Sequence, residues 1–250
     1  MQSATLPPLR EGFSTLSEQV YGAILGAIIE RRVEPGERLM LDDLAQQLRV
    51  SRTPVRDALS RLAAEGLVEP TGRRGFRVTA PTAADLIALY DMRLMCELYA
   101  AEKGIGNVTP AFLVRLEELA NDCARLARSA DPTDRLVLSL RDRKLHNGII
   151  SLGQNPKLSE LYERLNIHMH SLRASASHAA TGGVEELYVA EHAAIIAALR
   201  DGDVAAAKQS IRLHILNAQA RTLAALAMDE AVRSLSCQPP GDKRKVAGDG

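Results

Sequence analysis

Tryptophan is absent from this chain of 250 residues, and aromatic residues account for only 3% of it. Leu, Ala and Ile must therefore fill most of the core, and a core of this kind favours helices. The hydrophobic fraction of 46% and the charged fraction of 25% are ordinary for globular proteins. The length suits two domains that each bury a core, although length alone also permits one.

Cysteine is scarce as well: Cys96, Cys123 and Cys237 are widely spaced and form no CxxC pair. Their pattern gives no sign of a zinc ribbon or a redox site, and it fits a reducing cytoplasm. The chain has no run of about eighteen uninterrupted apolar residues, and its first residues lack the apolar stretch of a signal peptide. We therefore expect a soluble cytoplasmic protein with no membrane partner.

Lysine is absent from residues 1–80, so every basic side chain in that stretch is an arginine. The formal net charge of the whole chain is zero, which by itself argues against a nucleic-acid partner. Residues 49–77, however, contain seven arginines and three acidic residues, a surplus of four positive charges. Arginine is the planar, multi-donor cation that suits phosphates and guanine edges. The local charge therefore points to nucleic acid.

The N-terminal third is predicted to form three helices and two short strands. Residues 1–13 lack periodicity, and we interpret them as a flexible arm. Thr15 and Glu18 have the spacing of a capping box at the start of the first helix. Helices over about 41–48 and 52–65 follow, then strands over 67–69 and 76–78 around a basic, glycine-flanked loop. This order predicts a winged helix-turn-helix domain at residues 14–80.

Pro81 separates this unit from a region that is helical throughout. Capping residues and turn signals divide the region into six helices, the last of which ends near residue 230. Helices of these lengths predict a compact antiparallel six-helix bundle, at residues 81–230. Residues 231–250, which include two prolines and three glycines, are expected to form a disordered tail. The predicted fold class is therefore mainly α.

A basic surface is expected at the start of the helix over 52–65. Two short helices joined by a tight turn, the second with arginines on its outer face, match the geometry that places a recognition helix in the major groove. The alternative is that these arginines pair with Asp57 and Glu65 on a solvated face. The combination of helix, turn, basic helix and basic loop favours DNA. The residues expected to contact DNA are Ser51, Arg52, Thr53, Arg56, Arg73 and Arg74.

A second candidate site lies in the helical half. Asp142 and His146 are four residues apart, so they share one face of a helix. His192 and His214 each lie about eleven residues from the turn at 202–203, so in an antiparallel hairpin they stand at the same height. Four ligands from three helices can thus converge on one metal ion. Spacing alone leaves an alternative open, in which these histidines are surface residues or hydrogen-bonded core residues. We assign His168, His170 and His178 to this alternative.

Residues 17–79 resemble the winged helix-turn-helix of the GntR family of transcription regulators. The resemblance lies in the segments VEPGERL at 33–39, VSRTPVRDAL at 50–59, LAAEGLV at 62–68 and GFRV at 75–78. It implies that Ser51, Arg52, Thr53 and Arg56 contact DNA and that the wing around Arg74 and Gly75 assists. Some relatives also touch DNA through an arginine in the second helix. This chain has Asp42 there, so no such contact is carried over.

Residues 83–225 resemble the FCD ligand-binding domain of the FadR subfamily, in its VanR-like six-helix form. The resemblance lies in Arg93 with Glu97, Asp142 with His146, GQNP at 153–156, and the pattern from His192 through the turn at 202–203 to His214. It implies that Asp142, His146, His192 and His214 bind a divalent metal, commonly zinc, nickel or manganese. Mixed imidazole and carboxylate ligands do not choose among these ions.

Arg93 is the residue expected to bind an effector. Four protein ligands on a metal that takes six leave room for a carboxylate or hydroxy-acid, and a guanidinium can bind a carboxylate through two hydrogen bonds. The alternative is that Arg93 pairs with Glu97, four residues later, on the surface of the helix.

These features together predict a homodimeric repressor that binds a short pseudo-palindromic operator in double-stranded DNA. A small organic acid in the bundle would change the spacing of the two DNA-binding halves and release the operator. One alternative is a regulator in which the metal ion is the signal. Another is a metal-dependent hydrolase, although nothing in the sequence specifies the base it would need. The metal could also be purely structural in a bundle that only dimerises.

Overall fold

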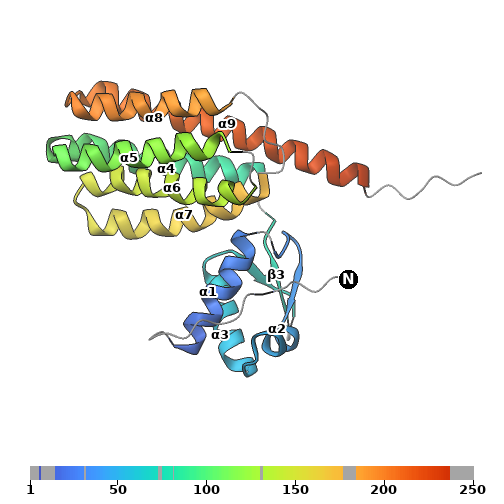
Figure 1. The fold of residues 1–250 in the computed structure, drawn as a ribbon. Helices are drawn as coiled ribbons and strands as arrows, with labels where there is room; N and C mark the ends of the chain where they lie inside the picture. Colours follow the sequence, from blue (N-terminus) through green and yellow to red (C-terminus); the bar gives the residue numbers. More distant parts are fainter. Residues whose placement is uncertain are drawn as a thin grey trace, which may run out of the picture.

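The computed structural model describes residues 6, 15–30, 32–72, 75–80, 82–129, 132–176 and 184–236. A small unit of three helices and one sheet occupies the N-terminal side, and a bundle of long helices forms the rest (Figure 1). Each unit has its own hydrophobic core. The predicted mainly helical fold class is confirmed.

The N-terminal unit is built on α1 (Leu16–Ile29), α2 (Leu41–Leu48) and α3 (Arg52–Ala64). The predicted capping box opens α1: the Thr15 hydroxyl accepts from the Glu18 N–H at 3.3 Å, and Glu18 accepts from the Thr15 N–H at 2.8 Å. Ile24 and its apolar neighbours on α1 pack with Leu59 and Leu62 of α3 in a common core. The outer face of α3 is thereby left to solvent.

A tight turn joins α2 to α3. Arg49 ends α2 in the left-handed region with φ of 56°, and the Val50 N–H donates to the carbonyl of Ala45 at 3.0 Å. Ser51 is then the extended N-cap of α3, and its side chain makes no capping hydrogen bond. The turn therefore places the start of α3, with Ser51 and Arg52, at an exposed corner.

The sheet has three antiparallel strands in the order β1-β3-β2: β1 (Arg38–Met40), β2 (Val68–Pro70) and β3 (Gly75–Val78). The two strands of the predicted wing are β2 and β3. Strand β1 was not predicted from the sequence, because three residues between a Pro-Gly turn and a helix are too few for alternation to show. Arg73 and Arg74, which were predicted to lie in the loop between these two strands, lie outside the described residues.

In the described residues the C-terminal unit has six α-helices, as predicted, and one short 3-10 helix, η1 (Ile105–Asn107). Thr82 caps the first of them in a box with Asp85, and Gly202, at φ of 67°, turns the chain between the last two. The helices are α4 (Ala83–Gly104), α5 (Pro110–Ala127), α6 (Pro132–Leu152), α7 (Pro156–Ala176), α8 (Val184–Arg200) and α9 (Val204–Ser236).

The expected end of the last helix near residue 230 is wrong. Helix α9 continues to Ser236, so residues 231–236 of the expected tail are helical. The reason is that no glycine or proline interrupts the segment before Pro239. Residues 237–250 lie outside the described part of the chain.

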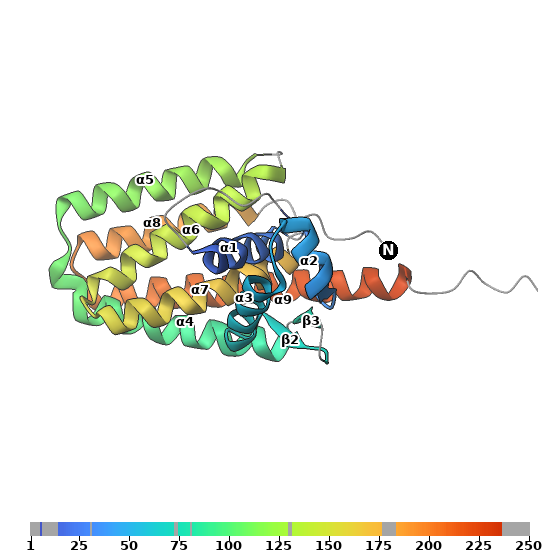
Figure 2. The ribbon, with the colours of Figure 1, turned by 90° about the horizontal axis from the view of Figure 1, so that it is seen from below.

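Helix α4 packs against α6, α7 and α9, while α5 packs against α6 and α8 (Figures 1 and 2). The C-terminal ends of α4 and α6 come very close. A Cβ atom placed on Gly104 would lie 2.2 Å from the carbonyl carbon and oxygen of Leu152. The Asn107 side chain donates to the same carbonyl at 2.8 Å. This crossing fixes α4 relative to α6, the two helices that carry much of the site described below.

The two units meet at α7, which contacts α1. Ile167 of α7 packs against the core of the N-terminal unit, and both views show α1 next to α7 (Figures 1 and 2). Within the described residues, no helix combines the length and the apolar character needed to cross a membrane.

Gly104→Ala is expected to destabilise the protein by about 3 kcal/mol, because the new methyl group would overlap backbone atoms of Leu152 that cannot rotate away. Gly106→Ala is the matched control, since a Cβ there meets nothing within 4 Å. Urea unfolding of the full chain, followed by circular dichroism, measures both. Equal unfolding midpoints for the two variants would contradict the close crossing.

Candidate nucleic-acid interface and candidate metal centre

The leading end of α3 carries an exposed polar surface. Pro54, Val55 and Leu59 face the core, whereas the four predicted DNA-contacting residues of this helix are all exposed. The structure thus brings together Ser51, Arg52, Thr53 and Arg56. The helix N-terminus adds backbone N–H groups that attract anions.

Gly75 is buried at the start of β3, where it closes the wing. Its carbonyl accepts from the Thr71 N–H at 2.9 Å, and a Cβ would lie 3.1 Å from the sulfur of Met40. A larger residue would therefore be tightly packed there, and a DNA contact by Gly75 stays a prediction. DNA contacts by Arg73 and Arg74 also stay predictions.

The arginines of α3 differ in their partners. Arg61 pairs with Glu65, with 3.2 Å between Nε and Oε1, and its guanidinium lies 3.9 Å from the ring centroid of Tyr21. Burial, together with the hydrogen bond that the Tyr21 hydroxyl donates to Glu65, raises the pKa of Tyr21 to about 12. The predicted alternative of arginine pairing within the helix thus holds for Arg61.

Arg52 and Arg56 do not pair within α3. Arg52 forms an ion pair with Asp42 of α2 instead. In the part of the chain that the structure describes, Arg56 forms no ion pair. Both side chains are exposed, so both are placed to meet an anionic partner.

The second site is a buried cluster of four side chains that could hold a metal ion. Asp142 and His146 come from α6, His192 from α8 and His214 from α9, and one ligand atom from each lies within 4.8 Å of all the others. Oδ1 of Asp142 is 3.5 Å from Nε2 of His146 and 3.4 Å from Nε2 of His192. Ligands placed about 2.1 Å from one ion in a tetrahedron would be about 3.4 Å apart. The distances therefore suit a common metal ion.

The histidine nitrogens support this interpretation. Within the described residues, the buried atoms Nε2 of His146, both ring nitrogens of His192 and Nε2 of His214 have no hydrogen-bond partner. A buried polar atom without a partner costs about 1–3 kcal/mol. A metal ion would satisfy one nitrogen of each ring, so the residues present fit a metal ion.

Two buried glutamates orient these rings. Nδ1 of His146 lies 2.7 Å from Oε2 of Glu97, and Nδ1 of His214 lies 2.9 Å from Oε2 of Glu191. Since an ionised carboxylate can only accept, each Nδ1 carries the proton and donates. The lone pair is then on Nε2, which lies in the cluster, as in metal sites where carboxylates fix the ligand tautomer.

Glu97 is fully buried and joins three helices. Its carboxylate accepts from Nε of Arg93 on α4 at 2.8 Å, from the Tyr162 hydroxyl on α7 at 2.5 Å and from His146 on α6. Burial alone would raise the pKa of Glu97, but His146 and Arg93 outweigh it and hold that pKa well below its usual range. Glu97 is therefore ionised.

Glu191 of α8 likewise accepts hydrogen bonds from side chains of a neighbouring helix, α9. It accepts from Nδ2 of Asn217 at 2.7 Å and from both terminal nitrogens of Arg221, at 3.1 and 3.0 Å. Burial opposes ionisation, yet the hydrogen bonds from His214, Arg221 and Asn217 lower its pKa to about 2. Glu191 was not among the residues predicted from the sequence, although its position next to His192 was a signal.

The imidazoles have different environments. Burial lowers the pKa of His214 to about 3 and also lowers that of His192, so both rings are neutral, as metal ligands must be. Burial and the positive charge of Arg93 would lower the pKa of His146 as well. The carboxylates of Glu97 and Asp142 outweigh them and raise that pKa.

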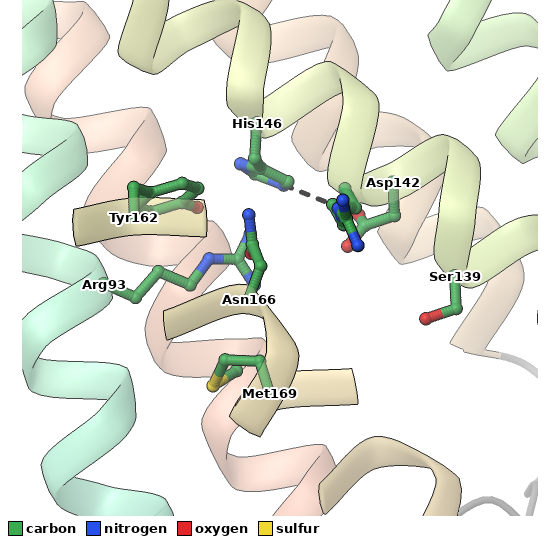
Figure 3. Close-up of a pocket in the computed structure, with 8 residues that line it drawn as sticks. Arg93, Ser139, Asp142, His146, Tyr162, Asn166 and Met169 are labelled. Atoms are coloured by element: carbon green, nitrogen blue, oxygen red, sulfur yellow. Dashed lines mark ion pairs between the residues drawn. The ribbon is translucent and has the colours of Figure 1, made fainter. Parts of the chain in front are cut away.

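A narrow cavity opens beside the cluster (Figure 3). Arg93 extends into it from α4 and Asn166 from α7, next to His146 and Asp142. In this conformation the cavity has room for about one water molecule. The residues that line it are Arg93, Ser139, Asp142, Arg143, His146, Tyr162, Asn166 and Met169.

The alternative for Arg93, a pair with Glu97 on the helix surface, is right about the partner and wrong about the exposure. The pair exists, but Arg93 is only 3% exposed and Glu97 is 0% exposed. Both are buried because the face of α4 that carries them packs against α6 and α7, and Arg93 also lines the cavity. Arg93 therefore remains the candidate for binding an anionic ligand.

Comparison with known families agrees with both units. The model of the FCD domain matches residues 88–217, and the model of the bacterial regulatory proteins of the gntR family matches residues 16–78. The chain belongs to the GntR family of transcriptional regulators. The relatives described below are named as transcriptional regulators, which supports a regulator and not the hydrolase alternative.

Two similar relatives align with most of the regulator. The uncharacterized HTH-type transcriptional regulator YdhC of Bacillus subtilis is 28% identical over 199 residues, which are 78% of this chain and 86% of YdhC. A probable D-xylose utilization operon transcriptional repressor of Paenarthrobacter nicotinovorans is 27% identical over 203 residues, 81% of this chain and 86% of that protein. The similarity thus extends over both units.

A solved structure shows the same fold. McbR/YncC of Escherichia coli superposes on the regulator with a TM-score of 0.72 at 23% identity, and the match covers 84% of this chain and 98% of that one. The arrangement of a GntR helix-turn-helix unit followed by an FCD helical domain is thereby confirmed.

Zinc is expected to stabilise the wild-type protein by binding the four-residue cluster, and His192→Ala is expected to remove most of this effect by deleting one ligand. At a zinc concentration of about 100 Kd the stabilisation would be about 2.7 kcal/mol, or about 5 °C or more in melting temperature. Thermal unfolding of metal-free protein with and without zinc measures it. Ser139→Ala, at the cavity but outside the cluster, is the control and should respond as wild type does. An equal zinc response in all three proteins would argue against the site.

Proposed function

We propose that the regulator is a homodimeric repressor whose affinity for a pseudo-palindromic operator is controlled by a small organic acid, bound at a divalent metal ion in the FCD domain. The observation that carries this proposal is the position of Arg93. A buried guanidinium lines the same cavity as the Asp142 and His146 side chains of the candidate metal site. A cation beside a metal centre is the combination that recognises a carboxylate.

In this proposal the leading end of α3 enters the major groove. Arg52 and Arg56 contact bases or phosphates, and the hydroxyls of Ser51 and Thr53 contact the backbone of the duplex. Arg73, Arg74 and Gly75 of the wing assist. The exposure of the first four side chains at one helix end supports this assignment.

The metal would be held by Asp142, His146, His192 and His214, and the ligand set suits zinc, nickel or manganese. When bound, such an ion supplies a Lewis acid that fixes a carboxylate or hydroxyl oxygen of the effector. Arg93 binds a second oxygen of the same molecule. Glu97 orients both Arg93 and the metal ligand His146, since it accepts a hydrogen bond from each of them.

Helix α7 is suited to pass the signal on. Tyr162, Asn166 and Met169 of α7 line the cavity, while Ile167 packs against the core of the DNA-binding unit. Because the cavity holds about one water molecule in this conformation, an organic acid can enter only if the lining helices move. A shift of α7 would move α1 and with it α3, which changes the spacing of the two recognition helices.

Dimerisation is supported by an apolar stripe on α4. Met92, Met95 and Tyr99 recur at intervals of three and four residues on this helix, and all three side chains are exposed. Exposed apolar side chains that lie in a row mark an interaction surface. A two-fold axis at the FCD domains would set two recognition helices about one turn of B-DNA apart.

The narrowness of the cavity favours one second candidate, a regulator in which the metal ion itself is the signal. An ion can bind the four ligands without opening the bundle. The two candidates differ in one respect: an ion sensor changes its DNA affinity with metal alone, whereas an acid sensor needs both ligands.

Arg52→Ala is expected to lower affinity for a duplex selected by the wild-type protein about tenfold or more, because one arginine contact to a base or phosphate is lost. Arg61→Ala removes the same charge from the same helix, but Arg61 is engaged with Glu65 and Tyr21, so affinity should hardly change. Fluorescence anisotropy at fixed salt measures both. Equal losses in the two variants would indicate a general charge effect and not a recognition helix.

The effector is expected to release DNA only when the metal is present. The test is a gel-shift titration of the selected duplex with metal-free protein, with zinc alone, and with zinc plus a panel of small di-, tri- and hydroxy-carboxylic acids. We expect release in the third arm, and no release by any acid for Arg93→Ala. Release by zinc alone would favour the ion sensor, and indifference to every combination would overturn ligand control.

A further inference from the structure

The DNA-binding unit contains an ion pair that the proposed contacts do not use. Asp42 is the second residue of α2, Arg52 is the first of α3, and Nε of Arg52 pairs with Oδ1 of Asp42 across the turn. These helices lie at the end of the molecule away from the bundle (Figure 1). The pair is thus at the corner that the proposed function presents to the duplex.

Folding does not account for this pair. The Arg52 side chain is 64% exposed and that of Asp42 is 46% exposed. An ion pair in water at this exposure contributes little to stability, because the solvent screens it and two side chains lose freedom. A bare carboxylate beside DNA would also repel the phosphates. The position therefore needs another explanation.

The geometry of the pair supplies one. A guanidinium has five N–H groups in a fixed plane, and the bond to Asp42 engages the Nε side of it. The edge formed by the two terminal nitrogens points away from Nε, and this edge can bind O6 and N7 of guanine through two hydrogen bonds. A carboxylate paired with Nε thus fixes the orientation of the guanidinium and leaves its two terminal nitrogens available to bind guanine.

We propose that Asp42 is a positioning residue that presents Arg52 to a guanine in the major groove and so sets the base preference of the recognition helix. This proposal rests on the proposed function of α3. It separates two properties of the surface: Arg52 supplies the contact, while Asp42 restricts its direction and reduces attraction to DNA of any sequence. Arg56, which forms no ion pair among the described residues, keeps its freedom to follow a phosphate.

Asp43 provides a control of the same charge. It is the next residue of α2 and is also exposed, and in the described part of the chain it forms no ion pair. Replacing either aspartate by alanine removes one negative charge from the same helix turn. General electrostatics therefore affects both variants alike, and only a positioning role distinguishes them.

The experiment is selection of duplexes from a randomised pool by the full-length wild-type protein, by Asp42→Ala and by Asp43→Ala, with sequencing of the enriched pools. We expect a guanine in the wild-type and Asp43→Ala motifs whose preference falls about tenfold in Asp42→Ala, within the range that one bidentate arginine contact provides. Binding to an unrelated duplex should tighten several-fold in both variants, because each loses a negative charge.

A second measurement tests whether Asp42 acts through Arg52. In an Arg52→Ala background, Asp42→Ala should cause no further change of base preference. The proposal is overturned if the Asp42→Ala motif equals that of wild type, or if Asp43→Ala loses the same guanine. If the wild-type protein itself enriches no sequence, the proposed function fails as well, and this outcome is distinct from the others. Thermal unfolding of Asp42→Ala near the wild-type temperature shows that the fold is kept.

Discussion

A buried, ionised carboxylate at the junction of three helices is the interaction on which the FCD domain depends. Glu97 has no access to water, and its charge is tolerated only because Arg93, Tyr162 and His146 all donate to it. These donors come from α4, α7 and α6, so the helices can pack only in the arrangement that brings them together. Losing one donor would leave a buried charge with too few partners, which is far more costly than losing an exposed pair.

The same principle governs the other side of the site. Glu191 holds the His214 ring and is itself held by Asn217 and Arg221, which ties α8 to α9. The two glutamates therefore do two things at once. They bring helices together through polar contacts, and they engage Nδ1 of two imidazoles, which leaves Nε2 of each ring for the cluster. Apolar packing supplies most of the stability, whereas these polar contacts define the position of each ring.

Features that depend on short sequence spacing could be predicted from the sequence. The capping residue Thr15 and the six bundle helices follow from local patterns, and the convergence of His192 and His214 follows from their equal distance to one turn. Asp142 and His146 follow from helical periodicity. The candidate metal cluster was thus accessible without a structure, because each step involved neighbours along a helix or across one hairpin.

Features that depend on packing between distant elements could not be predicted. Arg93 and Glu97 have the spacing of an ordinary surface pair, and only the packing of α4 on α6 and α7 buries them. Glu191 resembles any helical glutamate until α9 is placed beside it. The Asp42–Arg52 pair crosses a turn whose geometry depends on the left-handed residue Arg49, and strand β1 exists only because β3 lies next to it.

The equal height of His192 and His214 across the turn at 201–203 limits how this hairpin can vary in length. One residue added within either helix, between the turn and its histidine, would shift that ring by about 1.5 Å along the axis and rotate it by about 100°. The ring would then lose its contact with the cluster, and a shifted His214 would also lose its hydrogen bond to Glu191. Substitutions on the outer faces of α8 and α9 are free of this restriction, so the hairpin can diverge widely in sequence while its residue count stays constant.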